Sequence, residues 1–289
     1  MTKQLIINFV IAFLLLSCKS DKSDKNDLSK RNLKGQIQTI KDRAYNAIQK
    51  FGEIVKDESK QRSLTIYTFN KKGFETSSEI YLANGVLLSK QENKYNPKDY
   101  IIEMVEYDEN ALLKHKTKYV YKNESKNYEE EFIYAANGTL ERKNTYKYDK
   151  LGNLIEERNF NSTGIETGKS TSIFDKNNNE IEVSMYGVNP DTPYIKWVKK
   201  YDNRHNVIER NTFGLSPLSS KYNTHLDYVL SKYDENNNEV ETQIFDLIKN
   251  EKSITKIEYK YDKKGNWIKR TLIENGIPNF IEEREMEYY

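Results

Sequence analysis

The chain has little of the chemistry from which metal and thiol sites are built. It contains one cysteine, Cys18, in 289 residues. No intramolecular disulfide can therefore form, although an exported protein is able to use one. The only histidines are His115, His205 and His225, and none has the close His or Cys spacing of a zinc site. We predict no metal ion and no cofactor.

A charge excess of one sign is also missing. Lysine and arginine number 46 and aspartate and glutamate 44, so the formal net charge is only +2. No basic block stands out, and nucleic acid is therefore not an expected partner. The carboxylates alternate with lysines, which is typical of cross-strand pairing on a solvated sheet. No nucleophile–base signature accompanies the histidines. We predict no catalytic site and no enzyme.

Proline is scarce, and its placement is informative. Three of the five prolines fall within two irregular stretches, residues 187–193 and 214–220. Proline cannot donate to a strand ladder, so both stretches are predicted to be longer loops on one rim. Insertions in repeat proteins often gather on the binding face, but drift in a tolerant loop gives the same pattern.

Tyrosine, by contrast, is abundant and periodic, with 22 tyrosines in the chain. Aromatic anchors recur in two sets, and within each set most neighbours are 26 or 27 residues apart. The first set is Phe69, Tyr95, Tyr121, Tyr148, Phe174, Tyr201, Tyr233 and Tyr261, and the second is Tyr81, Tyr107, Tyr134, Phe160, Tyr186, Phe213, Phe245 and Leu272. A fixed period of this length indicates a repeat architecture.

The residues after each anchor predict a turn. An Asp or Asn often follows directly, where its side chain can bond the backbone ahead. The fourth residue is usually glycine, with Asn178, Asn237 and His205 as substitutes. These residue types tolerate the left-handed backbone region that closes a type I turn with a bulge. Each anchor therefore ends a strand, and each repeat is one hairpin.

The strands between the turns alternate in polarity. Residues 256–261 place Ile257, Tyr259 and Tyr261 on one face and charged residues on the other. Sixteen anchors predict an all-β antiparallel meander of about seventeen short strands, about eight residues each. Open twisted sheets of that width curl. We expect a rolled or spiralling single sheet with its aromatic face, carrying both anchor sets, turned inward.

These segments resemble a known repeat family. The sequence around Tyr148, Asp149, Gly152 and Asn153, and the corresponding run at 261–267, resemble the YD repeats of Rhs and teneurin-type proteins. The resemblance covers roughly residues 65–289. It implies hairpins that spiral into a shell. The large relatives can enclose a toxin domain, but this chain carries none, so encapsulation is not transferred to it. The whole chain looks like small Bacteroidota lipoproteins built from such repeats.

The N-terminus has a different character. Lys3 precedes an apolar run from Leu5 to Leu16, which is too short for an ordinary membrane span and suits a signal peptide. Residues 15–18 resemble a bacterial lipobox, which implies that Cys18 is the lipid attachment site. We predict a lipoprotein signal peptide at 1–17, a lipidated Cys and flexible polar tether at 18–32, and the repeat domain at 33–289. Residues 33–67 fit either a helix stripe or a first strand, and Gly35 and the Phe51-Gly52 turn favour the strand.

Two further patterns are better explained by structure than by ligands. Residues 175–179 and 234–238 imitate the start of a calcium loop, but Tyr186 and Phe245 stand where its bidentate Glu is needed. Turn chemistry explains both segments. Trp197 and Trp267 lie in strand-like runs. Ordinary packing explains them more simply than stacking on a sugar or a protein partner does.

Together these features predict an outer-membrane lipoprotein of the cell envelope, held to the membrane by its lipidated N-terminus. Its expected role is non-enzymatic binding or display for a polymer or protein partner, such as a glycan or an envelope protein. The alternative is an assembly subunit that pairs exposed sheet edges with another protein. An enzyme of unrecognised type is a weaker alternative. A membrane-spanning barrel is disfavoured, because its strands need an outward apolar band.

Overall fold

The protein is an antiparallel all-β structure in a computed structural model, which describes residues 26–122, 125–187, 191–215 and 222–289. One short helix, α1 (Asp27–Lys30), precedes eighteen strands. The strands are β1 (Ile37–Lys50), β2 (Glu53–Phe69), β3 (Glu75–Leu82), β4 (Leu87–Tyr95), β5 (Ile101–Tyr107), β6 (Leu113–Val120), β7 (Glu130–Ala135), β8 (Leu140–Tyr148), β9 (Leu154–Asn161), β10 (Glu166–Phe174), β11 (Glu180–Tyr186), β12 (Ile195–Tyr201), β13 (Val207–Gly214), β14 (Thr224–Tyr233), β15 (Glu239–Asp246), β16 (Glu251–Tyr261), β17 (Trp267–Glu274) and β18 (Ile277–Tyr288).

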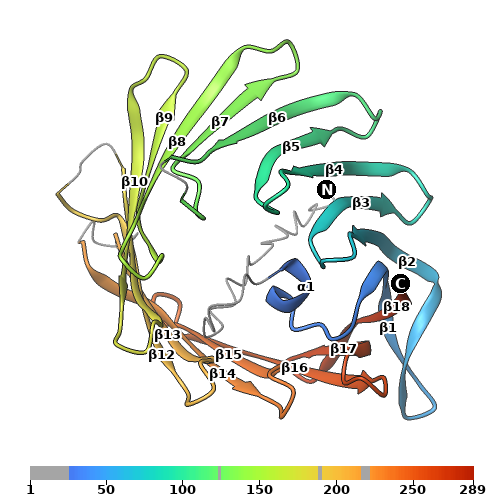
Figure 1. Ribbon diagram of the computed structural model, residues 1–289. Coiled ribbons are helices and arrows are strands. Elements are labelled where there is room, and N and C mark those ends of the chain that lie inside the picture. The colour runs from blue at the N-terminus through green and yellow to red at the C-terminus, as the bar shows by residue number, and fades with distance from the viewer. Residues whose placement is uncertain (1–25, 123–124, 188–190, 216–221) are drawn as a thin grey trace, which may run out of the picture.

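The sheet closes on itself. Each strand pairs with its sequence neighbours, and β1 pairs antiparallel with both β2 and β18, which gives the ring in Figure 1. The predicted meander is confirmed, with eighteen strands where about seventeen were expected and with a closed sheet where an open one was expected. Closure satisfies backbone groups that an open sheet would leave bare at its edges. A ring of 18 tilted strands has a diameter of roughly 36 Å.

The predicted turn chemistry is confirmed in atomic detail. Asp149 Oδ1 accepts hydrogen bonds from the backbone N–H of Leu151 at 2.8 Å and of Asn153 at 2.9 Å. Gly152 takes φ +86°, in the left-handed region. The same positive φ occurs at the other predicted turn positions, Gly73, Gly85, Gly138, Gly164, Asn178, His205, Asn237, Gly265 and Gly276.

The prediction that both anchor sets share one face is wrong. The pairing of Phe69 with Glu75 is followed by a register shift, because Thr68 pairs with Ser77 and leaves one extra residue on β3. Such a bulge moves every later side chain of the strand to the opposite face. Tyr81 therefore lies on the face opposite Phe69, and similar shifts follow most of the turns.

The N-terminal segment shows which face is interior. α1 lies inside the ring beside β2 and β3 in Figure 1. Its Asp27 accepts a hydrogen bond from Tyr95, and Arg31, directly after the helix, lies over the Tyr67 ring, both on the first-anchor face. That face is therefore the inner wall. The face that carries the second anchors, apart from Leu272, is the outer wall, and lysine ammonium groups cover several of its rings. Leu272 pairs with Ile257 and so lies on the inner wall with Tyr259. These pairs are Lys90–Tyr107, Lys118–Tyr134, Lys169–Tyr186, Lys196–Phe213 and Lys252–Phe245.

The compact core is small and lies against the N-terminal segment. Leu28, Leu33, Ile37, Ile40 and Phe69 form one buried cluster. Elsewhere most inward tyrosines are only partly buried, as expected for a ring too wide for side chains to fill. The cluster also corrects the predicted tether, because residues 26–32 are packed and Leu28 is buried. Residues 33–67 form strand, as favoured, with a turn at Phe51 and Gly52.

The Gly138→Ala variant tests whether backbone conformation at the turns stabilises the ring. No atom lies within 4 Å of a Cβ added at Gly138, so the change costs only its φ of +82°. We expect a loss of about 1 kcal/mol in the free energy of unfolding, measured by urea titration. Gly168→Ala is the control, because Gly168 is not in the left-handed region. Equal effects of the two changes would contradict this account.

Candidate functional site: a cleft at one rim of the ring

The turns form two rims of different composition. The proximal rim is defined by the turns that follow the even-numbered strands from β2 to β16, and the described chain begins and ends beside it at Asn26 and Tyr289. The distal rim is defined by the turns that follow the odd-numbered strands from β1 to β17. The distal rim contains a cleft of substantial volume.

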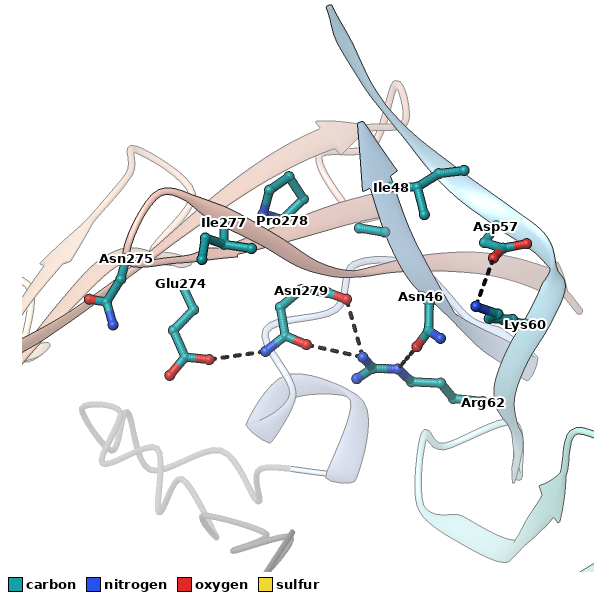
Figure 2. Close-up of a pocket in the computed structure, with 11 residues that line it drawn as sticks. Asn46, Ile48, Asp57, Lys60, Arg62, Glu274, Asn275, Ile277, Pro278 and Asn279 are labelled. Atoms are coloured by element: carbon teal, nitrogen blue, oxygen red, sulfur yellow. Dashed lines mark hydrogen bonds and ion pairs between the residues drawn. The ribbon is translucent and has the colours of Figure 1, made fainter. Parts of the chain in front are cut away.

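This cleft, the distal cleft, has a volume of about 520 Å³. Figure 2 shows it between the β1–β2 hairpin and the turn that joins β17 to β18. Its lining combines amides, charged groups and aliphatic side chains. The residues are Asn46, Ala47, Ile48, Asp57, Lys60, Arg62, Glu274, Asn275, Ile277, Pro278 and Asn279.

An irregularity in β2 shapes one wall. Tyr45 pairs with Gln61, but Ala47 pairs with Lys56, so the four residues 57–60 of β2 lie opposite Asn46 alone and three of them are extra. Asp57 Oδ1 accepts hydrogen bonds from the Ser59 hydroxyl at 2.6 Å and from the Ser59 N–H at 3.1 Å. The bond from the hydroxyl lowers the pKa of the Asp57 carboxyl. Extra residues of this kind bend a strand, and two residues of this stretch, Asp57 and Lys60, line the cleft.

Arg62 joins the two walls. Its Nε donates to Asn46 Oδ1 at 2.5 Å, and its Nη2 donates to the backbone oxygen and to Oδ1 of Asn279 at 3.2 and 3.0 Å. Figure 2 shows these bonds across the cleft. The guanidinium also lies 5.5 Å from the Phe280 ring centre. No carboxylate of the described chain pairs with Arg62. The hydrogen bonds of its guanidinium go to amide and carbonyl oxygens.

The remaining groups balance that charge. Asn279 Nδ2 donates to Glu274 Oε2 at 3.1 Å, and Lys60 lies 3.8 Å from Asp57. The cleft therefore holds two cations and two carboxylates, with hydrogen-bond donors and acceptors on both sides. Ile277, 70% exposed, adds an apolar surface at the mouth. The arrangement suits a ligand that is neutral, rich in hydroxyl groups and partly apolar.

The comparisons with known proteins show only distant likeness. No family model matches the chain, and no curated protein matches its sequence significantly. A porin-like protein from Bacteroides uniformis aligns at 12% identity over 87% of this chain and 98% of its own, with a TM-score of 0.43.

Two further solved structures show a weaker likeness. A porin-like protein from Bacteroides vulgatus aligns at 12% identity over 89% of this chain and 99% of its own, with a TM-score of 0.20. A Photorhabdus luminescens Tc holotoxin pore structure aligns at 11% identity over 73% of this chain and 14% of its own, with a TM-score of 0.33. Likeness this low carries no argument about function.

The structure places most of the residues singled out in the sequence. Cys18 lies outside the described residues, as do parts of the two proline-bearing loops. His205 occupies its turn position and its Nδ1 lies 2.6 Å from Asn179 Oδ1. Trp267 is buried beneath Arg270 and Arg284, which confirms packing for that residue. Within the described ranges, no three His, Cys, Asp or Glu side chains gather as a metal site requires.

Sequence reasoning missed the cleft. Arg62 lies 217 residues before Asn279 and 16 residues after Asn46, and none of the three belongs to a recognised motif. The only signal was the loss of the regular anchor spacing before Phe69, where β1 and β2 run to 14 and 17 residues. Separately, no helix in the described part of the chain has the length and apolar character to cross a bilayer.

Proposed function

We propose that this protein is a lipid-anchored component of the bacterial envelope that binds a neutral glycan segment at the distal cleft without catalysing a reaction. The observation that carries the proposal is the Arg62 arrangement, which presents a guanidinium, amides and carboxylates of balanced charge beside Ile277. Hydroxyl groups both donate and accept, so a saccharide can use groups of both kinds. Membrane attachment through Cys18 remains part of this proposal, as does the relation to YD repeats.

The outer wall supports placing the ring outside the bilayer. A membrane-spanning barrel turns an apolar band about 25 Å tall toward lipid. Here the outer wall carries ion pairs near the proximal ends of its strands and also further along them, as at Lys90–Glu79 and Arg158–Glu166, and a hydrocarbon layer would not solvate these charges. These pairs include Lys41–Glu287, Arg43–Glu285, Lys94–Glu103, Lys143–Glu130, Lys147–Glu156, Lys200–Glu209 and Lys232–Glu241.

An assembly role is the second candidate, by a different route from the one the sequence suggested. Pairing through free sheet edges is wrong, because β1 and β18 pair with each other. The distal rim instead exposes large apolar side chains at several turns, which favours contact with another protein. These residues include Phe51, Val86, Leu112, Ile165, Leu247 and Ile277.

Glycan binding is tested with the purified full-length protein in detergent on an array of neutral and anionic polysaccharides. We expect retention of neutral glycans. The Arg62→Ala variant should weaken binding by about tenfold or more, because hydrogen bonds to charged groups contribute roughly 1.5–3 kcal/mol.

Lys147→Ala is the matched control, since Lys147 lies on the outer wall and, among the residues that the structure describes, pairs with Glu156 alone. It should bind like the unaltered protein. The glycan proposal fails if no polysaccharide is retained, or if both variants lose binding equally. Recovery of one fixed protein after crosslinking, lost on Phe51→Ser, would favour the assembly role instead.

A further inference from the structure

The tips of the proximal rim are cationic. In most of its turns the second or third residue after the anchor is lysine or arginine. These residues are Lys71, Lys72, Lys98, Lys150, Lys176, Arg204, Lys263 and Lys264. The corresponding positions of the distal rim are almost uncharged, with Ala136 and Asn137 or Ser162 and Thr163 as examples. The two rims therefore present different electrostatic surfaces.

Several of these cations are available to a partner. Lys98, Lys150, Lys176 and Lys263 are exposed, and in the part of the chain that the structure describes none of them forms an ion pair. Beside three of these lysines the neighbouring carboxylate is engaged by its own turn: Asp149, Asp175 and Asp262 each accept from two backbone N–H groups. Asp99, beside Lys98, pairs with Lys72. The first three carboxylates keep their charge but are tied to the turn backbone, while the ammonium groups stand at the tips.

The N-terminal segment is fixed to the same rim. Asn26 Nδ2 donates to the backbone oxygen of Lys72 at 2.7 Å, and Leu28 N–H donates to the oxygen of Gly73 at 3.1 Å. Further on, Lys34 N–H donates to Asn266 Oδ1 at 2.7 Å. The chain therefore enters the ring at a fixed place, between the β2–β3 and β16–β17 turns.

Chain length limits how far this rim can lie from an anchor. Seven residues lie between Cys18 and Asn26, and the eight Cα-to-Cα steps between them span at most about 28 Å. We infer that the proximal rim is a docking surface for the anionic headgroups of the bilayer that holds the N-terminus, so that the distal cleft faces away from that membrane. The inference rests on the proposed membrane attachment. The occupant is a lipid surface because separated cations around a ring match a layer of negative charge and do not converge on one small anion.

The test uses the full-length lipoprotein in vesicles of phosphatidylcholine alone or mixed with phosphatidylglycerol. A fluorophore is attached at Asn177→Cys on the proximal rim or at Thr163→Cys on the distal rim, and a headgroup-bound quencher reports proximity. The unaltered protein should take up no label if Cys18 is acylated. With the anionic lipid, we expect proximal quenching to exceed distal quenching by about threefold, and to fall at 1 M salt, where the screening length is about 3 Å.

A fourfold variant identifies the groups responsible. Lys98, Lys150, Lys176 and Lys263 are changed together to glutamine, which should remove the excess proximal quenching. The control changes Lys118, Lys147, Lys232 and Lys256 of the outer wall to glutamine, with the same change in net charge, and should behave as the unaltered protein.

The outcomes separate the two ideas. If the protein fails to float with vesicles, the proposed attachment is wrong and this inference falls with it. If it floats but both labels are quenched equally, or the distal label more, attachment stands and the docking surface is overturned. Proximal quenching that is the same in neutral vesicles, or unchanged by the fourfold variant, also overturns it.

Discussion

Replacing Asp42 with alanine is expected to lower the free energy of unfolding by about 3–5 kcal/mol, because it leaves a buried guanidinium without its partner. Arg284 donates from Nε and Nη2 to the two Asp42 oxygens at 2.7 and 2.6 Å. Only 9% of the Arg284 side chain and 6% of the Asp42 side chain are exposed. The pair joins β1 to β18, where the ring closes. Urea denaturation followed by tryptophan fluorescence measures the loss, since Arg284 lies 3.5 Å from the Trp267 ring centre.

Lys41→Ala provides the matched control on the same strand pair. Lys41 bonds Glu287 on the outer wall, where both side chains are substantially exposed. Exposed pairs contribute about 0–1 kcal/mol, so the control should change stability little. If Asp42→Ala is no more destabilising than Lys41→Ala, the buried pair does not stabilise the pairing of β1 with β18. A second variant, Asp42→Asn, retains the shape of the side chain. It should lower the free energy of unfolding by less than alanine does, while still weakening the pairing of β1 with β18.

The Phe69→Ala variant is expected to cost about 3–5 kcal/mol as well, because it leaves a cavity in the only compact core of the described chain. Phe69 is 1% exposed and packs with Leu28, Ile37 and Ile40. The change should also release the N-terminal segment, since Leu28 loses its main apolar partner. Thermal unfolding measures the first effect, and hydrogen exchange at the backbone N–H of Leu28, which is bonded to Gly73, measures the second.

Phe51→Ala is the control for this change, because the Phe51 side chain is 96% exposed. It should leave the free energy of unfolding within about 0.5 kcal/mol of the original value. Loss of stability in Phe69→Ala without faster exchange at Leu28 would show that the cluster supports the strands but does not hold α1. Comparable loss in both variants would contradict the assignment of the core.

The local structure of the repeats follows from short stretches of sequence. A turn is decided by a few neighbouring residues, as in Asp149 and Gly152, where a side-chain acceptor and a left-handed glycine act within five positions. Strand polarity is equally local, since alternate residues must face opposite ways. For these reasons the turns, the hairpins and the all-β class could be predicted without coordinates.

The β-bulges after the turns explain why the prediction of a shared face for both anchor sets failed. One extra residue after the turn, as between Phe69 and Tyr81, reverses the face of the following strand. The residue types predict a bulge. The wall to which the following side chains point, however, depends on how the strand pairs with its neighbour. The distal cleft could not be predicted from local sequence, because Arg62 and Asn279 meet only when the sheet closes.

By itself, then, the sequence determined where the chain turns, that it forms antiparallel hairpins, and that its charges alternate along the strands. Only the tertiary structure decided that the sheet closes, which anchor set faces inward, and where a cleft forms. The physical reason is the sequence range of the interactions. Turns and alternation depend on a few neighbouring residues, whereas the Asp42–Arg284 pair joins residues that are 242 positions apart.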